Sequence, residues 1–237
     1  MNPILVALDV PTAAAALSLA DTLRGAVGGF KIGSQLFTAA GPQIVKTMVD
    51  RGDRVFLDLK FHDIPNTVSG AIQSASSLGV WMVNVHASGG RPMMEAARKA
   101  ADDAQKAGAV RPIVIAVTVL TSLDATTLAS VGVTASPLEQ VVRLAELAKA
   151  SGLDGVVASP QETAAIRKAC GADFAIVTPG IRGGTADATK GDQQRTLSPA
   201  EAMAAGSSYL VIGRPITATA DPRAAAIKIS EQLATRN

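Results

Sequence analysis

Residues 54–67 read RVFLDLKFHDIPNT, and this stretch contains one complete transition from a strand to a helix. Residues 54–60 form a short apolar run with its charges toward the ends, and Pro65 stands where a helix can begin. The run is nearly continuous rather than strictly alternating, which is typical of a parallel strand buried on both faces. The stretch therefore predicts a β-strand that leads directly into a helix.

The same pattern occurs eight times along the chain. The predicted strands are 4–9, 30–33, 54–60, 80–87, 112–120, 155–159, 174–179 and 209–213. The helical segments that follow them are 12–24, 35–51, 65–78, 91–107, 137–151, 161–169, 199–205 and 222–235. Eight strand–helix units predict an α/β fold, a single-domain (β/α)8 TIM barrel over residues 1–237. An open doubly wound sheet is the alternative, because periodicity does not prove closure.

The composition excludes several classes of protein. Of 237 residues, 48% are hydrophobic and 18% charged, which excludes a disordered chain. The net charge of +2 provides no general field for nucleic acid or membrane. Cys170 is the single cysteine, so a disulfide framework and a multi-cysteine zinc site are excluded. Asp9 interrupts the apolar N-terminal run, which is then too short for a signal peptide or membrane span, and we expect a soluble, cytoplasmic protein.

Polar residues are concentrated where the predicted strands end. In a parallel barrel the C-terminal ends of the strands meet at one face, and that face carries the site. Because buried charges are costly unless they are paired, charges at several strand ends predict a shared polar pocket. The polar residues at or just after these ends include Asp9, Lys31, Asp58, Lys60, Asn84, Thr121, Arg182 and Arg214.

The richest group follows the third strand. Asp58 and Lys60 are two residues apart, so on a strand they project to the same face, and Lys31 from the neighbouring strand can reach them. With Asp63 in the next turn, an alternating array of charges would keep Lys60 protonated and fixed, as a general acid requires. A buried ion-pair network that only specifies the fold is the alternative. Asp63 and Thr67 could instead cap the next helix.

A second group of residues follows the last two strands. Gly213 and Arg214 follow the eighth strand, and Arg182 and Gln193 belong to the long, weakly patterned segment 180–198. Barrels often bind phosphate between these two loops, and arginine grips phosphate in a bidentate way. We expect a phosphate site here, with 180–198 as a mobile closing loop. A surface insertion with solvated side chains is the alternative. No HxH or HExxH spacing supports a metal site.

The segment DLKFHDIPNT (58–67) contains the pattern D-x-K-x-x-D-I-P-x-T intact, and here the chain closely resembles the orotidine 5′-phosphate decarboxylase family. The resemblance implies a (β/α)8 barrel homodimer without cofactor or metal. It implies conversion of orotidine 5′-phosphate to UMP and CO2 in pyrimidine biosynthesis. Further matches, in the expected order, are ALD at Asp9, KIG at Lys31, WMVNVHASGG (81–90), TVLTS (118–122), TPGIR (178–182), GDQ (191–193) and VIGRP (211–215).

The resemblance also implies a role for each matched residue around the pyrimidine and ribose. Asp9 would hold a ribose hydroxyl, and Lys31 would join the charge array and touch the ribose. Lys60 would donate the proton to C6, and Asp58 would lie beside the substrate carboxylate. Thr121 would meet the pyrimidine or its carboxylate.

For the remaining matched residues the resemblance implies subunit and phosphate contacts. Asp63, Ile64 and Thr67 would reach into the neighbouring subunit's site, which would make each site composite. The residues expected at the phosphate end are Arg182, Gln193, Gly213 and Arg214. In the sequence GDQQR, Gln194 could take the place of Gln193.

Two other functions remain open. A magnesium-dependent sugar-phosphate decarboxylase or aldolase shares the D-x-K-x-x-D core. In those enzymes an acidic residue near the end of the second strand helps to bind the metal, and here Lys31 takes its place. A non-catalytic UMP-binding protein that kept the site is the second possibility. The complete set of Lys31, Asp58, Lys60 and Asp63 argues against it.

Overall fold

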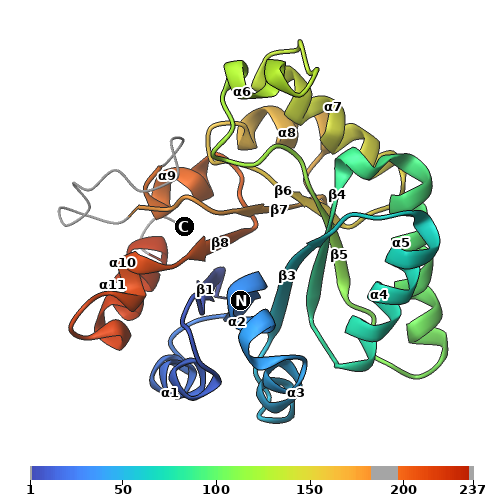
Figure 1. The fold of residues 1–237 in the computed structure, drawn as a ribbon. Coiled ribbons are helices and arrows are strands. Elements are labelled where there is room, and N and C mark those ends of the chain that lie inside the picture. The colour runs from blue at the N-terminus through green and yellow to red at the C-terminus, as the bar shows by residue number, and fades with distance from the viewer. Residues whose placement is uncertain (1, 183–196, 235–237) are drawn as a thin grey trace.

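The computed structural model describes residues 2–182 and 197–234, in which eight parallel strands form a closed barrel. The strands follow one another in chain order, and β1 closes the barrel by pairing with both β2 and β8 (Figure 1). The prediction of a TIM barrel is confirmed, and the open sheet is excluded. The strands are β1 Ile4–Ala7, β2 Gly29–Gly33, β3 Val55–Phe61, β4 Met82–His86, β5 Ile113–Val117, β6 Gly155–Val157, β7 Ala175–Thr178 and β8 Tyr209–Ile212.

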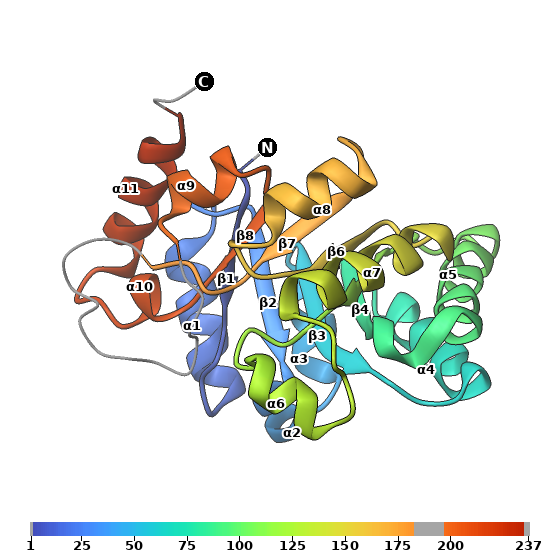
Figure 2. The same cartoon turned by 90° about the horizontal axis from the view of Figure 1, so that it is seen from above.

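The helices surround the strands, as two perpendicular views show (Figures 1 and 2). Each connection between one strand and the next contains at least one helix, as a parallel barrel requires, and the last two helices follow β8. The helices are α1 Ala13–Leu23, α2 Ser34–Ala40, α3 Gln43–Asp50, α4 Pro65–Ser77, α5 Gly90–Lys106, α6 Ala125–Ser130, α7 Pro137–Ala150, α8 Thr163–Cys170, α9 Pro199–Ala204, α10 Arg214–Thr217 and α11 Pro222–Ala234, with a 3-10 turn at Ala87–Gly89.

The observed helices differ from the predicted ones in three places. The single helix expected over 35–51 is two helices, α2 and α3, because Gly41 takes a left-handed φ of 67° and Pro42 follows it. The short helices α6 and α10 were not predicted. Asp124 starts α6 by accepting a hydrogen bond from the Thr127 backbone N–H.

Several strands end earlier than the sequence predicts. β1 ends at Ala7 instead of residue 9, and β5 ends at Val117 instead of residue 120. The residues that leave the sheet lie at the C-terminal mouth of the barrel, where the chain turns toward the next helix. Asp9 and Thr121 therefore lie in loops at the mouth and not on the strands.

The barrel interior is packed and does not form a pore. Side chains from alternating strand positions fill it, as is typical of this fold. They are Leu5, Ala7, Phe56, Met82, Ile115, Val177 and Val211. At the N-terminal end, the rings of Trp81 and Tyr209 meet edge to face with centroids 5.1 Å apart. The space for a ligand therefore lies above this plug, at the opposite end of the strands. Across residues 2–182 and 197–234, every helix is too short or too polar to cross a bilayer.

Candidate active site

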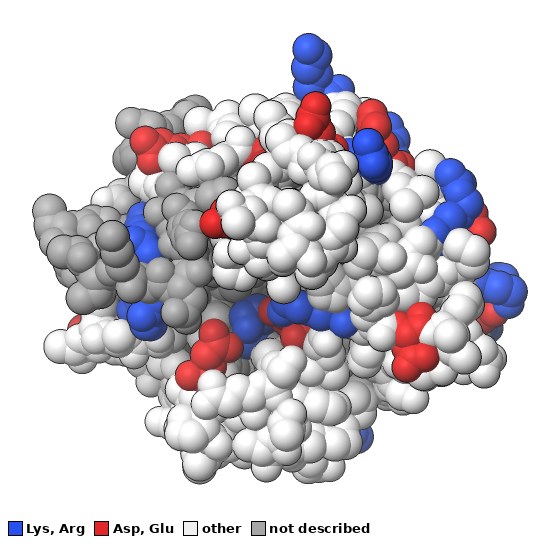
Figure 3. All heavy atoms as spheres, turned by 45° about the horizontal axis from the view of Figure 1, so that its top comes forward, with Lys and Arg blue, Asp and Glu red and all other residues white. Residues whose placement is uncertain are grey.

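A cavity of about 470 Å³ opens at the C-terminal ends of the strands. This volume lies in the usual range of small-molecule sites, roughly 300–1,000 Å³. The surface view shows basic and acidic side chains side by side in a hollow (Figure 3). The lining residues are Ala7, Asp9, Lys31, Phe56, Asp58, Lys60, Val117, Val119, Leu120, Thr121, Val157, Pro179, Gly180, Ile181, Arg182, Val211, Gly213, Arg214 and Pro215.

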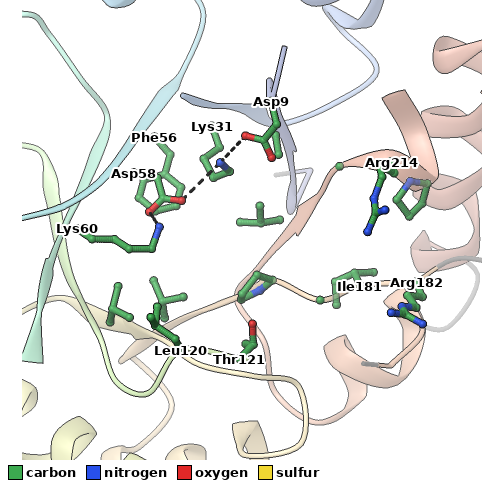
Figure 4. Close-up of a pocket in the computed structure, with 18 of the residues that line it drawn as sticks. Asp9, Lys31, Phe56, Asp58, Lys60, Leu120, Thr121, Ile181, Arg182 and Arg214 are labelled. Atoms are coloured by element: carbon green, nitrogen blue, oxygen red, sulfur yellow. Dashed lines mark hydrogen bonds and ion pairs between the residues drawn. The ribbon is translucent and has the colours of Figure 1, made fainter. Parts of the chain in front are cut away.

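Four charged residues form an alternating row along one wall of this cavity (Figure 4). Lys31 Nζ lies 3.1 Å from Asp9 Oδ1 and 3.5 Å from Asp58 Oδ2. Lys60 Nζ lies 2.6 Å from Asp58 Oδ1. Each ammonium has a carboxylate neighbour, so the row is held together by opposite charges. The sequence predicted three of its members together, and Asp9 is the fourth.

Asp63, the fourth member of the array expected from the sequence, is not part of this row within one chain, and its place in a neighbouring subunit's site stays a prediction. Asp63 is exposed and does not line the cavity, and its carboxylate accepts a hydrogen bond from the Ile64 backbone N–H at 2.6 Å. It lies two residues after the end of β3, in the turn before α4. Ile64 is 66% exposed, and Thr67 is also exposed on the surface. The alternative that Asp63 or Thr67 caps α4 is also unsupported, because Ile64 occupies the N-cap position without a side-chain cap.

Asp58 is the most buried carboxylate of the row, with 13% of its side chain exposed. Burial works to raise the pKa of Asp58. The charges of Lys31 and Lys60, and hydrogen bonds from Lys60 and Asn84, outweigh burial and hold this pKa below its ordinary value. Asp58 is therefore ionised at neutral pH and holds both ammonium groups at the cavity wall.

The backbone at Lys60 explains how its side chain reaches Asp58. Among the described non-glycine residues, Lys60 alone has a positive φ, at 54°. The pairing of β3 with β4 also shifts register between Leu57 and Phe61. The sequence predicted that Lys60 lies beside Asp58 because residues two apart on a regular strand share a face. The contact is present, but the backbone between these residues is not a regular strand. A non-glycine residue in this conformation costs on the order of 1–3 kcal/mol, and such strain is common at functional sites.

Two residues to which the sequence assigned no role in the site also shape the row. Asn84 is fully buried in β4 and contacts both Asp58 and Lys60. Gly33 ends β2, and a Cβ atom there would lie 2.9 Å from Lys31 Nζ. The sequence signal for Asn84 was a polar residue inside an apolar strand. Gly33 had no clear signal in the sequence, because no sequence pattern shows that a glycine leaves room for the side chain of another residue.

The residues expected to bind phosphate lie across the cavity from Lys60. Figure 4 shows Arg182 and Arg214 at one end of the cavity and Lys60 with Asp58 at the other. Gly213 and Thr121 also line it. The structure thus brings both predicted groups of residues into one cavity, with a cationic end on each side.

Residues 183–196 lie outside the described residues, and Gln193 and Gln194 are among them. The choice between these two glutamines and the closing role of 180–198 stay predictions.

Two histidines stand close together beside the charged row. The rings of His62 and His86 are 5.4 Å apart. Burial, followed by the neighbouring His62 and Lys60, lowers the pKa of His86 below its ordinary value. The neutral imidazole adds no further positive charge beside Lys60. Within residues 2–182 and 197–234, no group of three or more His, Cys, Asp or Glu side chains could hold a metal ion.

Comparisons with known proteins identify relatives over almost the whole chain. A sequence model of the "Orotidine 5′-phosphate decarboxylase / HUMPS family" matches residues 2–229. Orotidine 5′-phosphate decarboxylase of Moorella thermoacetica is 55% identical over 98% of this chain and 92% of the relative. The enzyme of that name from Halorhodospira halophila is 55% identical, covering 98% and 95%. The crystal structure of orotidine 5′-phosphate decarboxylase from Lactobacillus acidophilus superposes with a TM-score of 0.86 at 36% identity, covering 98% and 99%.

We predict that Gly33→Ala disturbs the charged row without unfolding the barrel. The added methyl group would lie 2.9 Å from Lys31 Nζ and 3.5 Å from Asp9 Oδ1, so the ammonium must move. We expect kcat/KM for the substrate to fall about tenfold or more, because small displacements at a site are costly. Steady-state kinetics and thermal unfolding, measured on the same preparation, check this. Unchanged kcat/KM would show that Lys31 tolerates displacement.

Proposed function

Because the chain belongs to the orotidine 5′-phosphate decarboxylase / HUMPS family, we infer that it is a carboxy-lyase that converts orotidine 5′-phosphate to UMP and CO2 in pyrimidine biosynthesis. The observation that carries this function is the row Asp9–Lys31–Asp58–Lys60 at the mouth of the barrel, in a chain about 55% identical to enzymes of that name. The location expected from the sequence, the cytoplasm, remains part of the proposal.

We propose that the substrate lies across the cavity with its pyrimidine at Lys60 and its phosphate at Arg182 and Arg214. The two cationic ends support this orientation, because the substrate carries a carboxylate on the ring and a phosphate at the far end. Asp9 and Lys31 then face the ribose. Thr121 then contacts the pyrimidine or its carboxylate, and Gly213 lies at the phosphate.

The proposed reaction breaks one carbon–carbon bond and forms one carbon–hydrogen bond. The C6–carboxylate bond breaks, CO2 leaves, and the electron pair remains on C6. The Lys60 ammonium then donates a proton to C6 to give UMP. The resulting neutral amine regains a proton from water, so the protein returns to its starting state.

Electrostatic stabilisation is the main source of catalysis in this proposal. The electron pair on C6 lies in the ring plane and is not delocalised by the π-system. As the carboxylate charge moves to C6, it moves toward Lys60, so the attraction is stronger in the transition state than in the ground state. The fixed position of Lys60, 2.6 Å from Asp58, supports this role, because a preorganised charge need not reorient during the reaction.

Asp58 has two possible roles, repulsion of the substrate carboxylate or orientation of Lys60. We propose orientation. Its carboxylate lies 2.6 Å from Lys60 Nζ and 3.5 Å from Lys31 Nζ, so its charge is already matched by two cations. A carboxylate that is paired with two cations repels a neighbouring anion less than an unpaired carboxylate does.

We also propose that the protein acts as a homodimer with composite sites. Asp63, Ile64 and Thr67 are exposed around the start of α4 and do not line the cavity of their own subunit. An exposed isoleucine beside a carboxylate and a hydroxyl suits insertion into a second copy related by a two-fold axis.

We propose that the reaction needs neither metal nor cofactor. Lys31 supports this, because it places an ammonium where the magnesium-dependent alternative needs an acidic ligand. Its Nζ lies between Asp9 and Asp58, so a divalent cation there would meet a positive charge.

We predict that Lys60→Ala reduces kcat at least about a thousandfold, because the proton donor and the nearest positive charge are both lost. UMP binding should persist, since the phosphate end is intact. Loss of orotidine 5′-phosphate, followed by absorbance in EDTA, measures the rate. Lys46→Ala, which removes an exposed lysine paired with Asp50, is the matched control and should keep wild-type activity. Near-normal turnover of Lys60→Ala would refute the role of Lys60, and wild-type activity abolished by EDTA would favour the magnesium-dependent alternative.

We predict that Arg214→Ala mainly weakens phosphate binding. Removal of one cation–phosphate contact should lower UMP affinity by about ten- to a hundredfold, which corresponds to about 1.5–3 kcal/mol. Calorimetric titration with UMP and with uridine measures the effect, and the affinity for uridine should not change. Arg143→Ala on the exposed face of α7 is the control. Equal UMP affinity in wild type and Arg214→Ala would remove Arg214 from the site.

We predict that two inactive variants restore activity when they are mixed. In a mixed dimer of Lys60→Ala and Asp63→Ala, one site has both defects and the other has none. Random exchange should therefore recover about one quarter of wild-type activity. A mixture of Lys60→Ala with Asp58→Asn is the control, because both residues belong to the same subunit's part of the site. No recovery in the first mixture, with subunit exchange verified, would contradict composite sites.

A further inference from the structure

Asn84 joins the two residues at the centre of the charged row. It lies in β4, next to β3, and its side chain is fully buried. Its Nδ2 donates a hydrogen bond to Asp58 Oδ1 at 2.7 Å, and its Oδ1 accepts one from the Lys60 backbone N–H at 2.8 Å. A single amide therefore holds the carboxylate of one residue and the backbone of the other.

The hydrogen bond to Lys60 N–H coincides with the irregular part of β3. The register between β3 and β4 shifts between Leu57 and Phe61, and Lys60 takes a φ of 54° at this point. The Asn84 side chain supplies the acceptor for Lys60 N–H. An unpaired buried N–H is costly, so this bond favours the left-handed conformation over a regular strand. In a regular strand the Lys60 side chain would leave the backbone in a different direction.

The requirement for an amide at position 84 follows from its two partners. The backbone N–H of Lys60 needs an acceptor, and an ionised Asp58 needs a donor. A carboxylate of the same shape offers only acceptors, and leucine of similar size offers neither. Glutamine would need space for one more methylene in a fully buried position.

We propose that Asn84 is a positioning residue for the decarboxylation, which fixes the Lys60 backbone and the Asp58 carboxylate in the arrangement that protonates C6. This inference rests on the proposed function and extends it to a residue of β4 that does not line the cavity. Asn84 acts through Lys60 and Asp58, so its loss changes turnover more than ligand binding.

The first test compares kcat with UMP affinity in Asn84→Leu. We expect kcat to fall about a hundredfold, because Lys60 and Asp58 lose their shared support. UMP affinity should change less than about threefold, because the phosphate end is untouched. Thr178→Val is the matched control. It removes a hydrogen bond from a fully buried strand residue, whose Oγ1 lies 2.7 Å from Ser207 Oγ, outside the cavity lining. It should leave kcat within about threefold of wild type.

The second test uses Asn84→Asp, which keeps the acceptor for Lys60 and loses the donor to Asp58. Two carboxyl groups in contact share a proton at low pH, and the shared proton restores the donor. The charged and titratable groups around the pair are Lys31, Asp58, Lys60, His62 and His86. They are the same in wild type, so we take the ratio of variant to wild-type kcat at each pH. This ratio should rise as the pH falls from 8 to 6. Protonation of a buried carboxyl pair also stabilises the fold at low pH, so kcat is calculated per folded protein, with the folded fraction measured by circular dichroism at each pH.

The outcomes separate this inference from the proposed function. If wild type does not decarboxylate orotidine 5′-phosphate, the proposed function fails. If wild type turns over and Asn84→Leu matches it, the positioning role of Asn84 is wrong. A parallel loss of kcat and UMP affinity in Asn84→Leu would also overturn it, because that indicates a structural role. If Asn84→Leu does not fold, a flat pH ratio for Asn84→Asp overturns the inference and a rising ratio supports it.

Discussion

The Asp58 carboxylate meets two ammonium groups and one amide, and the site depends on this shared contact. Lys60 lies 2.6 Å away, Asn84 2.7 Å and Lys31 3.5 Å. Burial alone would favour a neutral Asp58, and a neutral Asp58 would remove the ion pair that holds Lys60 and leave Lys31 paired with Asp9 alone. Because the lysine charges and the hydrogen-bond donors outweigh burial, the carboxylate stays ionised and keeps the Lys60 ammonium at the cavity wall, where we propose that the carbanion forms. Removing any partner leaves a buried charge less well compensated, which is the costly case for ion pairs in proteins.

Barrel closure brings these partners together although they are far apart in the chain. Lys31, Asp58 and Asn84 come from β2, β3 and β4, and Asp9 follows β1. Parallel pairing places the four strand ends at the same face, and the packed interior below them excludes the ligand from the other end. The apolar strands thus provide a rigid support for the charged residues at their C-terminal ends, and among the described strand residues only Lys60 departs from regular strand geometry, with a positive φ.

The fold was predictable because each strand has a simple periodic signal, whereas parts of the site depend on geometry without such a signal. Eight apolar runs identified the eight strands, and the polar residues at their ends identified the cavity. The left-handed Lys60 could not be predicted, since no glycine or turn sequence marks it. Asn84 was visible as a polar residue in an apolar strand, but its partners became clear only in three dimensions. Asp63 follows Lys60 closely in sequence but does not line the cavity of its own chain, because closeness along the chain does not set the direction of a side chain in a turn.

The most direct test of the central claim is a crystal structure of the protein with UMP bound. With UMP bound, we expect Lys60 Nζ about 3–3.5 Å from C6 of the pyrimidine and still in contact with Asp58, because proton transfer needs this proximity. The phosphate should lie at Arg214. A structure in which Lys60 points to solvent, or in which the pyrimidine lies at Arg214 and the phosphate at Lys60, would contradict it.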